Sequence, residues 1–194
     1  MTRIVAGRWA SRRLATPAGA ATRPTSDRVR EAVFAHIAAT LGTAADPPDS
    51  QLAGLTFLDL FAGSGAVGLE AASRGAASVT WVERDAATAR LAERNRRDLG
   101  APGLVVRADA ATFAARPATG FDLVWLDPPY DLPAAAVDAL IAQLAAGWLA
   151  DQALLLVERS ARSPAPTLNP DFSPAWARDY GETRIHLATW RPAA

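Results

Sequence analysis

Four consecutive residues with chemical potential, Asp127-Pro128-Pro129-Tyr130, follow the apolar run Phe121–Leu126, which is typical of a buried strand. The two prolines fix the backbone and have no N–H donors, so their carbonyl oxygens are acceptors without a competing donor. Asp127 adds an acceptor, and Tyr130 offers a flat ring for stacking. Such a set suits an exocyclic amino group on a planar base, whose lone pair it can aim at an electrophilic methyl group. Asp127 or water would then take the proton. The alternative is a structural proline turn with a surface tyrosine.

A second segment is glycine-rich and follows another predicted strand, residues 56–60. Gly63, Gly65 and Gly68 form the pattern G-x-G-x-x-G, and Glu83 lies 20 residues beyond Gly63. This spacing satisfies the dinucleotide-binding fingerprint, in which the acid accepts from a ribose hydroxyl. The pattern indicates a nucleoside-binding site without choosing the nucleotide.

Asp59, at the carboxyl end of the same predicted strand, favours one cofactor. A pyrophosphate beside this carboxylate would be repelled at low dielectric, which disfavours an NAD-dependent oxidoreductase. S-adenosylmethionine has no phosphate, and its sulfonium and ammonium would be attracted. Glu83 would then hold the ribose, while Asp109 would accept from adenine or cap the following helix; the alternative for Asp59 is a turn or capping acid. The residues expected to bind the cofactor are Asp59, Phe61, Ala62, Gly63, Ser64, Gly65, Glu83, Arg84, Asp109 and Ala110.

The hydrophobic pattern predicts the elements that position these segments. Beyond residue 55, short apolar runs alternate with helical stretches, which predicts parallel strands with right-handed crossovers in a doubly wound, Rossmann-like α/β sheet. An antiparallel hairpin, 175–180 and 183–190, is expected to complete seven strands. Because ligands bind at the carboxyl ends of such strands, we expect the proline turn and the glycine turn to face one crevice. The other predicted strands are 56–60, 78–82, 104–106, 121–126 and 153–158, and the predicted helices are 27–41, 65–73, 86–99, 110–115 and 134–144.

Charge is unevenly distributed along this chain of 194 residues, whose formal net charge is zero. Residues 1–30 hold seven arginines and one acid, a net charge of +6, so the remainder carries −6. A basic segment suggests a polyanionic partner, although it could also be solvated and pair with the chain's own acids. We therefore expect a basic arm with a possible hairpin and a helix over 1–42, a loop over 43–54, and a catalytic domain over 55–194.

Composition excludes several classes of protein. The chain has no cysteine, which rules out disulfides and thiolate chemistry, and its two histidines are too few for a histidine-rich metal centre. We expect no bound metal. No run of 18 apolar residues is present, and no apolar signal core follows the basic N-terminus, so we expect a soluble, cytoplasmic protein without membrane contact.

The proline turn resembles the signature [DNS]-P-P-[YFW] of the class I, S-adenosylmethionine-dependent amino-methyltransferases. Three further segments together resemble the RsmD family of bacterial 16S rRNA guanine-N2 methyltransferases: residues 3–14, the run RPTSDRVREAVF at 23–34, and residues 61–76, which begin with the run FAGSGAVGLEA. The second segment is the most specific, because amino-methyltransferases in general lack it.

The resemblance implies a class I methyltransferase fold and transfer of a methyl group from S-adenosylmethionine to N2 of one guanine in 16S rRNA, of the guanine-966 type, within an assembling 30S subunit. It implies that Asp59 and Ala62–Gly65 cradle the cofactor, that Glu83 holds its ribose with Asp109 near adenine, and that Asp127–Tyr130 receives the guanine. A monomer is expected. The arginines expected to meet RNA phosphate are Arg3, Arg8, Arg12, Arg13, Arg23 and Arg28.

Two other functions stay open from the residues alone. The proline turn also permits methylation of adenine N6 in DNA or of a protein glutamine. A DNA enzyme would usually need a separate recognition domain, and glutamine enzymes usually carry asparagine where Asp127 stands. The second is a non-catalytic RNA-binding assembly factor, which the intact proline and glycine turns disfavour.

Overall fold

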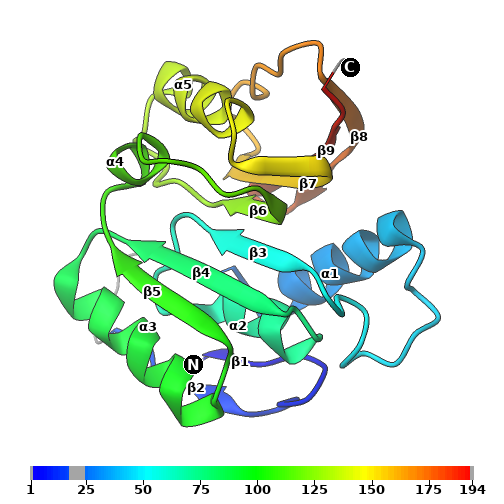
Figure 1. Ribbon diagram of the computed structural model, residues 1–194, viewed down its shortest axis with the longest axis vertical. Coiled ribbons are helices and arrows are strands. Elements are labelled where there is room, and N and C mark those ends of the chain that lie inside the picture. The colour runs from blue at the N-terminus through cyan, green and yellow to red at the C-terminus, as the bar shows by residue number, and fades with distance from the viewer. Residues whose placement is uncertain (1, 18–24, 193–194) are drawn as a thin grey trace. The chain divides into compact units, whose positions relative to one another are not determined.

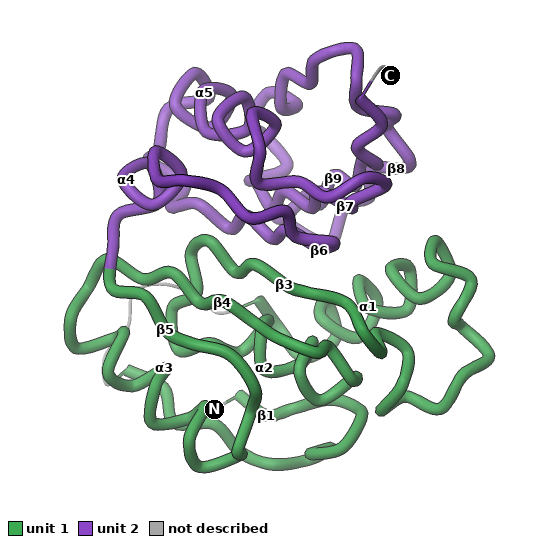
Figure 2. Tube along the Cα trace, in the orientation of Figure 1, with its two compact units in different colours: residues 1–107 green, residues 108–194 purple. Residues whose placement is uncertain are grey.

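The computed structural model describes residues 2–17 and 25–192, so that Arg23 lies outside the described residues. The chain divides into two compact units, residues 1–107 and 108–194 (Figures 1 and 2). Seven of its strands form a mostly parallel sheet whose C-terminal strands are antiparallel, as the sequence predicts. The division into arm, loop and catalytic domain stays a prediction.

The first unit contains three parallel strands in the order β5-β4-β3. Its helices begin and end at the residues that cap them: Ser26 Oγ accepts from the Val29 N–H, Asp85 Oδ1 accepts from the Thr88 N–H, and Gly100 ends α3 in the left-handed conformation. The elements are β1 (Thr2–Arg3), β2 (Arg13–Leu14), α1 (Asp27–Leu41), β3 (Thr56–Asp59), α2 (Ala66–Ser73), β4 (Ser78–Glu83), α3 (Ala86–Leu99) and β5 (Gly103–Arg107).

The second unit contains four strands in the order β6-β7-β9-β8. Strands β6 and β7 are parallel, whereas β9 runs antiparallel to both β7 and β8. Its core is formed by the apolar runs of β6 and β7, which are buried almost throughout. The elements are α4 (Ala110–Ala114), β6 (Phe121–Leu126), α5 (Ala134–Ala145), β7 (Leu149–Ser160), β8 (Phe172–Tyr180) and β9 (Thr183–Trp190).

The predicted elements all form, and the differences lie at their ends. The possible N-terminal hairpin is present, because β1 and β2 pair antiparallel. Strand β7 begins at Leu149, four residues before the predicted start. The prediction placed the start too late because the polar residues Asp151 and Gln152 interrupt the apolar pattern. Gln152 has φ of 62°, and the β6–β7 register shifts here, which is the geometry of a bulge. Within the described residues, no helix is long and apolar enough to cross a membrane.

Candidate active site

The turn between β3 and α2, Ala62–Gly65 (the glycine turn), is open to a ligand. Gly63 has φ of 54°, and a Cβ built there would meet no atom within 4 Å. Helix α2 begins directly after this turn, and no side chain caps its N-terminus. Space above the turn and helical N–H groups beside it are what a small anionic group such as a carboxylate requires.

Glu83, the last residue of β4, is fixed against the glycine turn. Its Oε2 accepts from the Gly63 N–H at 3.0 Å, and its Oε1 accepts from the Asp85 N–H at 2.8 Å. Each carboxylate oxygen has a second acceptor position. The half-buried side chain is therefore held in place and can still accept from two hydroxyl groups, as the predicted ribose contact requires.

Asp59, the last residue of β3, is a buried carboxylate with 1% of its surface exposed. Its Oδ2 accepts from the Gly68 N–H at 3.0 Å. Burial, with a smaller contribution from the negative charge of Glu83, raises the pKa of Asp59 to about 7, although the hydrogen bond from Gly68 lowers it. None of the described residues forms an ion pair with Asp59 within 4 Å, so a bound cation would stabilise its charged form. The ammonium of S-adenosylmethionine fits this requirement.

Gly68 is required by packing rather than by ligand approach. A Cβ at this position would lie 2.3 Å from Nε1 of Trp81. Trp81 is buried, and its Nε1 donates to the Gly65 carbonyl at 3.2 Å. The Trp81 side chain therefore holds the glycine turn in place through this hydrogen bond and through packing against Gly68, a role that the sequence pattern did not reveal.

The segment Asp127–Tyr130 (the proline turn) follows β6 in the second unit. Asp127 is half-buried and Pro128 is buried, whereas Pro129 is exposed. Tyr130 is 58% exposed, and its hydroxyl lies 3.2 Å from Oγ1 of Thr183 on β9. The ring is thus tethered at its hydroxyl end, and it is exposed enough to stack on a base.

Arg159 on β7, which sequence reasoning missed, fixes the proline turn. Its side chain is buried with 4% of the residue exposed, and it donates to the Leu132 carbonyl at 2.9 Å and to the Pro129 carbonyl at 3.5 Å. The Pro129 carbonyl also accepts from the Leu132 N–H at 2.9 Å. The only signal in the sequence is a charged pair, Glu158-Arg159, at the end of an otherwise apolar strand.

The remaining predicted cofactor residues divide between the two units. Phe61 and Ser64 lie in the first unit with Ala62, and Arg84 is exposed just after β4. Asp109 lies in the second unit and caps α4, because its Oδ1 accepts from the N–H groups of Ala111 at 3.0 Å and Thr112 at 3.4 Å; buried Ala110 is the first residue of that helix. The capping role of Asp109 is confirmed, and its contact with adenine stays a prediction.

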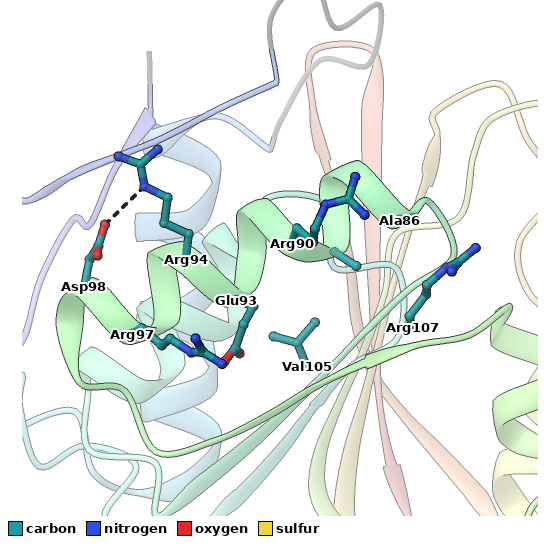
Figure 3. Close-up of a pocket in the computed structure, with 9 residues that line it drawn as sticks. Ala86, Arg90, Glu93, Arg94, Arg97, Asp98, Val105 and Arg107 are labelled. Atoms are coloured by element: carbon teal, nitrogen blue, oxygen red, sulfur yellow. Dashed lines mark hydrogen bonds and ion pairs between the residues drawn. The ribbon is translucent and has the colours of Figure 1, made fainter.

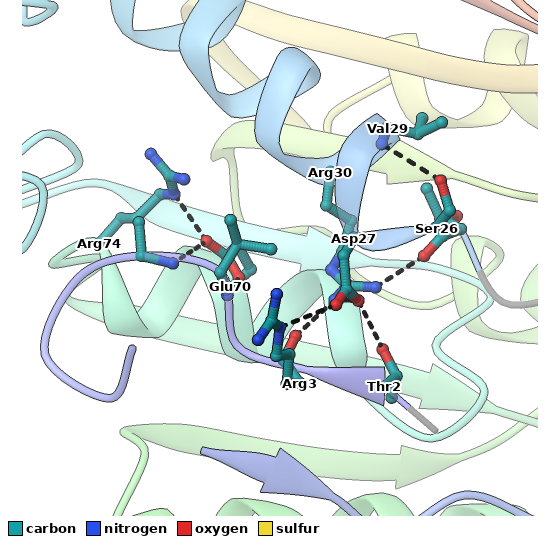
Figure 4. Close-up of polar contacts among 11 residues, drawn as sticks. Thr2, Arg3, Ser26, Asp27, Val29, Arg30, Glu70 and Arg74 are labelled. Carbon is teal, nitrogen blue, oxygen red and sulfur yellow. Dashed lines mark hydrogen bonds and ion pairs between the residues drawn. The ribbon is translucent and has the colours of Figure 1, made fainter. Parts of the chain in front are cut away.

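The N-terminal segment, residues 2–17, is anchored to α2 and α3 by buried polar side chains. Glu70 on α2 is fully buried and accepts from the N–H groups of Val5 at 2.7 Å and Ala6 at 3.0 Å. Its Oε1 also accepts from Nε of Arg74 at 2.9 Å (Figure 4). Asn95 on α3 exchanges two hydrogen bonds with the Ala15 backbone. Sequence reasoning missed this anchoring, and its only signal is a carboxylate within the apolar helix α2.

The predicted RNA-contacting arginines differ in how free they are. Arg3 forms an ion pair with Asp27 at 3.1 Å, and Asp27 also pairs with Arg30 at 2.8 Å (Figure 4). Arg30 is buried, so one of the seven N-terminal arginines is structural. The other described members of the predicted set are exposed: Arg8, Arg12, Arg13 and Arg28.

A glycine turn flanked by acids that end two adjacent parallel strands, on a seven-stranded and mostly parallel sheet, defines a class I methyltransferase dependent on S-adenosylmethionine. The comparisons agree with this class. A magnesium protoporphyrin IX methyltransferase from Synechocystis, solved with bound S-adenosylmethionine, shares the fold with a TM-score of 0.62 at 19% identity, over 90% of this chain and 87% of that one. The solved structure of yhhF from Escherichia coli has a TM-score of 0.83 at 33% identity, over 97% of each chain.

The family described as Conserved hypothetical protein 95 matches residues 2–189. The Ribosomal RNA small subunit methyltransferase D of Escherichia coli K12 is 38% identical over 174 residues, which cover 88% of this chain and 81% of that protein. This chain belongs to the RsmD family of methyltransferases.

Proposed function

We propose that this enzyme methylates N2 of one guanine in 16S rRNA, of the guanine-966 type, within an assembling 30S subunit. The observation that carries the proposal is the proline turn, in which the exposed Tyr130 ring follows two acceptors, the Asp127 carboxylate and the Pro128 carbonyl. A relative 38% identical to this chain is named for methylation of small-subunit ribosomal RNA. We further propose that the enzyme acts as a monomer in the cytoplasm.

We assign the base to the proline turn. Tyr130 would stack on the guanine, while Asp127 and one proline carbonyl accept its two amino hydrogens. The Pro129 carbonyl already accepts from Leu132 and Arg159, so we assign the second acceptor to Pro128. Two acceptors aim the nitrogen lone pair and stabilise the positive charge that develops on it. The N–C bond forms as the S–C bond breaks, and the amino proton leaves to Asp127 or water.

We assign the cofactor to the glycine turn and its two acids. When bound, S-adenosylmethionine supplies an electrophilic methyl group. Asp59 would hold the ammonium, Glu83 the ribose hydroxyls, and the N-terminus of α2 the carboxylate. The predicted contact between Asp109 and adenine belongs to the same proposal.

We assign RNA phosphate to the exposed arginines of the N-terminal region, with Arg23 included from the sequence. Arg8, Arg12 and Arg13 lie in the anchored segment and are exposed. Arginine suits this role because its planar guanidinium can pair with two phosphate oxygens at once.

The test is a labelling experiment with 30S particles from cells that lack the endogenous guanine-N2 enzyme. With radiolabelled S-adenosylmethionine, the wild-type chain should place label in N2-methylguanine at one 16S position. Asp127→Ala should reduce transfer by roughly 10²–10³-fold or more, since it removes an acceptor for the reacting amine. Its affinity for the cofactor should be unchanged by calorimetry.

Asp131→Ala is the matched control, because Asp131 is an exposed acid one residue beyond the proline turn. It should transfer methyl groups at close to the wild-type rate. Wild-type protein that binds the cofactor and labels no 30S RNA would overturn the proposal and direct the search to adenine in DNA or to protein glutamine. Equal losses in the two variants would remove Asp127 from the reacting centre.

A further inference from the structure

The first unit carries a second concentration of positive charge, which the proposed function does not use. Residues 84–107 hold six arginines and three acids, a net charge of +3. The rest of the chain beyond residue 30 holds seven arginines and sixteen acids, a net charge of −9. Positive charge is therefore concentrated in residues 84–107, whereas the rest of the chain beyond residue 30 is acidic.

Four of these arginines line a groove between α3 and β5, together with Glu93 and Asp98, and the groove has a volume of about 540 Å³ (Figure 3). Arg90, Arg94 and Arg97 follow one another at i, i+4 and i+7, which places them along one side of α3. Arg107 reaches the groove from β5, near the end of α3 where Ala86 lies, and Val105 forms part of the floor. The groove therefore has a basic rim and a small apolar floor.

Part of this charge is not neutralised by the protein. Arg94 pairs with Asp98 at 3.7 Å, and Arg97 pairs with Glu93. Arg90 and Arg107 are exposed and form no ion pair within 4 Å with another described residue. The two side chains carry full charges that are available to an anionic partner.

The groove also leads toward the cofactor side of the same unit. Arg107 is paired in register with Glu83 across β5 and β4, and Glu83 accepts from the glycine turn. Both residues are the last of their strands, so Arg107 lies at the carboxyl edge of the sheet, where the glycine turn also lies. A polyanion bound along α3 would have one end near the predicted ribose site.

We propose that this groove (the α3–β5 groove) binds the sugar–phosphate backbone of the substrate RNA, as a second contact separate from the N-terminal arginines. The inference rests on the proposed function, because it takes RNA as the substrate. Arginine forks match phosphate geometry, and several of them along a track favour a polyanion over an isolated anion. The groove lining includes no large exposed apolar side chain that would enter a lipid surface.

The test compares two double variants in RNA binding. Arg90→Gln with Arg107→Gln removes two groove charges and breaks none of the described ion pairs of α3. Arg162→Gln with Arg191→Gln is the matched control, because it removes two charges from exposed side chains in the second unit. The probe is the 30S particle from cells that lack the endogenous guanine-N2 enzyme. The affinity of each variant for this particle is measured at NaCl concentrations from about 50 to about 300 mM.

The groove variant should bind at least roughly tenfold more weakly at 0.1 M salt, and its slope of log K against log[salt] should be shallower by about 1.4–1.8. Its KM for the particle should rise with little change in kcat, and its cofactor affinity should stay at the wild-type value. The control variant should keep the wild-type slope. Equal slopes in the groove and control variants would overturn the inference while wild-type methylation of the particle still stood. Absence of wild-type methylation would instead overturn the proposed function.

Discussion

The two segments that we assign to RNA are held on the protein by opposite kinds of polar group. The N-terminal segment is held through its backbone N–H groups, which donate to the buried carboxylate of Glu70. The proline turn is held through the backbone carbonyl of Pro129, which accepts from the buried guanidinium of Arg159, as does the Leu132 carbonyl two residues beyond the turn. Each anchor lies on a regular element: Glu70 is on α2, and Arg159 is on β7.

The difference follows from the residues of the held segments. Pro128 and Pro129 have no N–H, so a carboxylate would find few donors in that turn, whereas a donor such as a guanidinium can hold its carbonyl oxygen. Val5 and Ala6 offer two consecutive N–H groups, which match the two oxygens of one carboxylate. The held backbone therefore determines the chemistry of its anchor, and each buried charge is stabilised by several hydrogen bonds.

Replacement of the Glu70 carboxylate should give the largest effect. Glu70→Ala leaves the N–H groups of Val5 and Ala6 without this acceptor, and it leaves the buried guanidinium of Arg74 without its ion pair. We expect the free energy of unfolding to fall by about 3–5 kcal/mol, the range for a broken buried ion pair. Urea unfolding followed by tryptophan fluorescence measures this change.

The same change should release the N-terminal segment. Trypsin cleavage after Arg8 and Arg12 should become faster in Glu70→Ala than in the wild type. Glu70→Gln, which keeps one acceptor, should give an intermediate rate if the alanine variant fails to fold. Glu31→Ala, an exposed glutamate on α1, is the control and should change neither quantity. Unaltered cleavage in both Glu70 variants would show that this carboxylate does not hold the segment.

Sequence patterns predicted the elements and the two turns well, because each depends on local chemistry. Ser26 and Asp85 cap the helices that follow them, and the apolar run 121–126 forms β6. Local chemistry also allowed two roles for Asp109, of which the structure shows the cap.

The anchors could not be predicted in the same way. Glu70 contacts residues 64 and 65 positions away, and Arg159 contacts residues 27 and 30 positions away. Their sequence signal is a charge within an apolar element, which indicates that a buried partner exists and does not identify it. The start of β7 was missed because Asp151 and Gln152, at the bulge, interrupt the apolar run from which the strand is predicted.

Replacement of the Arg159 guanidinium should reduce activity more than stability. Arg159→Met keeps an unbranched side chain and removes the charge, and an apolar replacement of a buried charge is often neutral for folding. The proline turn and Leu132 just beyond it would each lose one hydrogen bond, and misplacement of reacting groups by about 1 Å costs roughly 100-fold. We therefore expect kcat for RNA methylation to fall by about 10–100-fold, with cofactor affinity unchanged.

Arg159→Lys separates positioning from a merely structural role. Its ammonium keeps the charge and can reach one carbonyl, so it should recover part of kcat. Arg162→Met, an exposed arginine three residues away, should leave kcat unchanged. If Arg159→Met unfolds at the same urea concentration and methylates at the wild-type rate, the turn does not need this anchor.

Asp59 extends the comparison to a buried carboxylate that lacks a cation. Glu70 is paired with Arg74, whereas Asp59 forms no ion pair within 4 Å with any described residue, and burial raises its pKa to about 7. Between pH 4 and pH 7 the folded chain thus keeps a proton that the unfolded chain has lost, so this group lowers stability as the pH rises. Asp59→Asn should remove that part of the pH dependence of unfolding.

The affinity for the cofactor should rise with pH as Asp59 ionises, whereas the contribution of Asp59 to stability falls. An ammonium favours the ionised form of Asp59, so affinity for S-adenosylmethionine should increase about fivefold from pH 6 to pH 7, as the ionised fraction rises from roughly a tenth to a half. Calorimetry in buffers of different ionisation enthalpy should detect proton release on binding. Asp59→Asn should bind more weakly and without this slope, and Asp49→Asn, at an exposed acid, should behave as the wild type. A slope that persists in Asp59→Asn would assign the titration to another group and the ammonium to another acceptor.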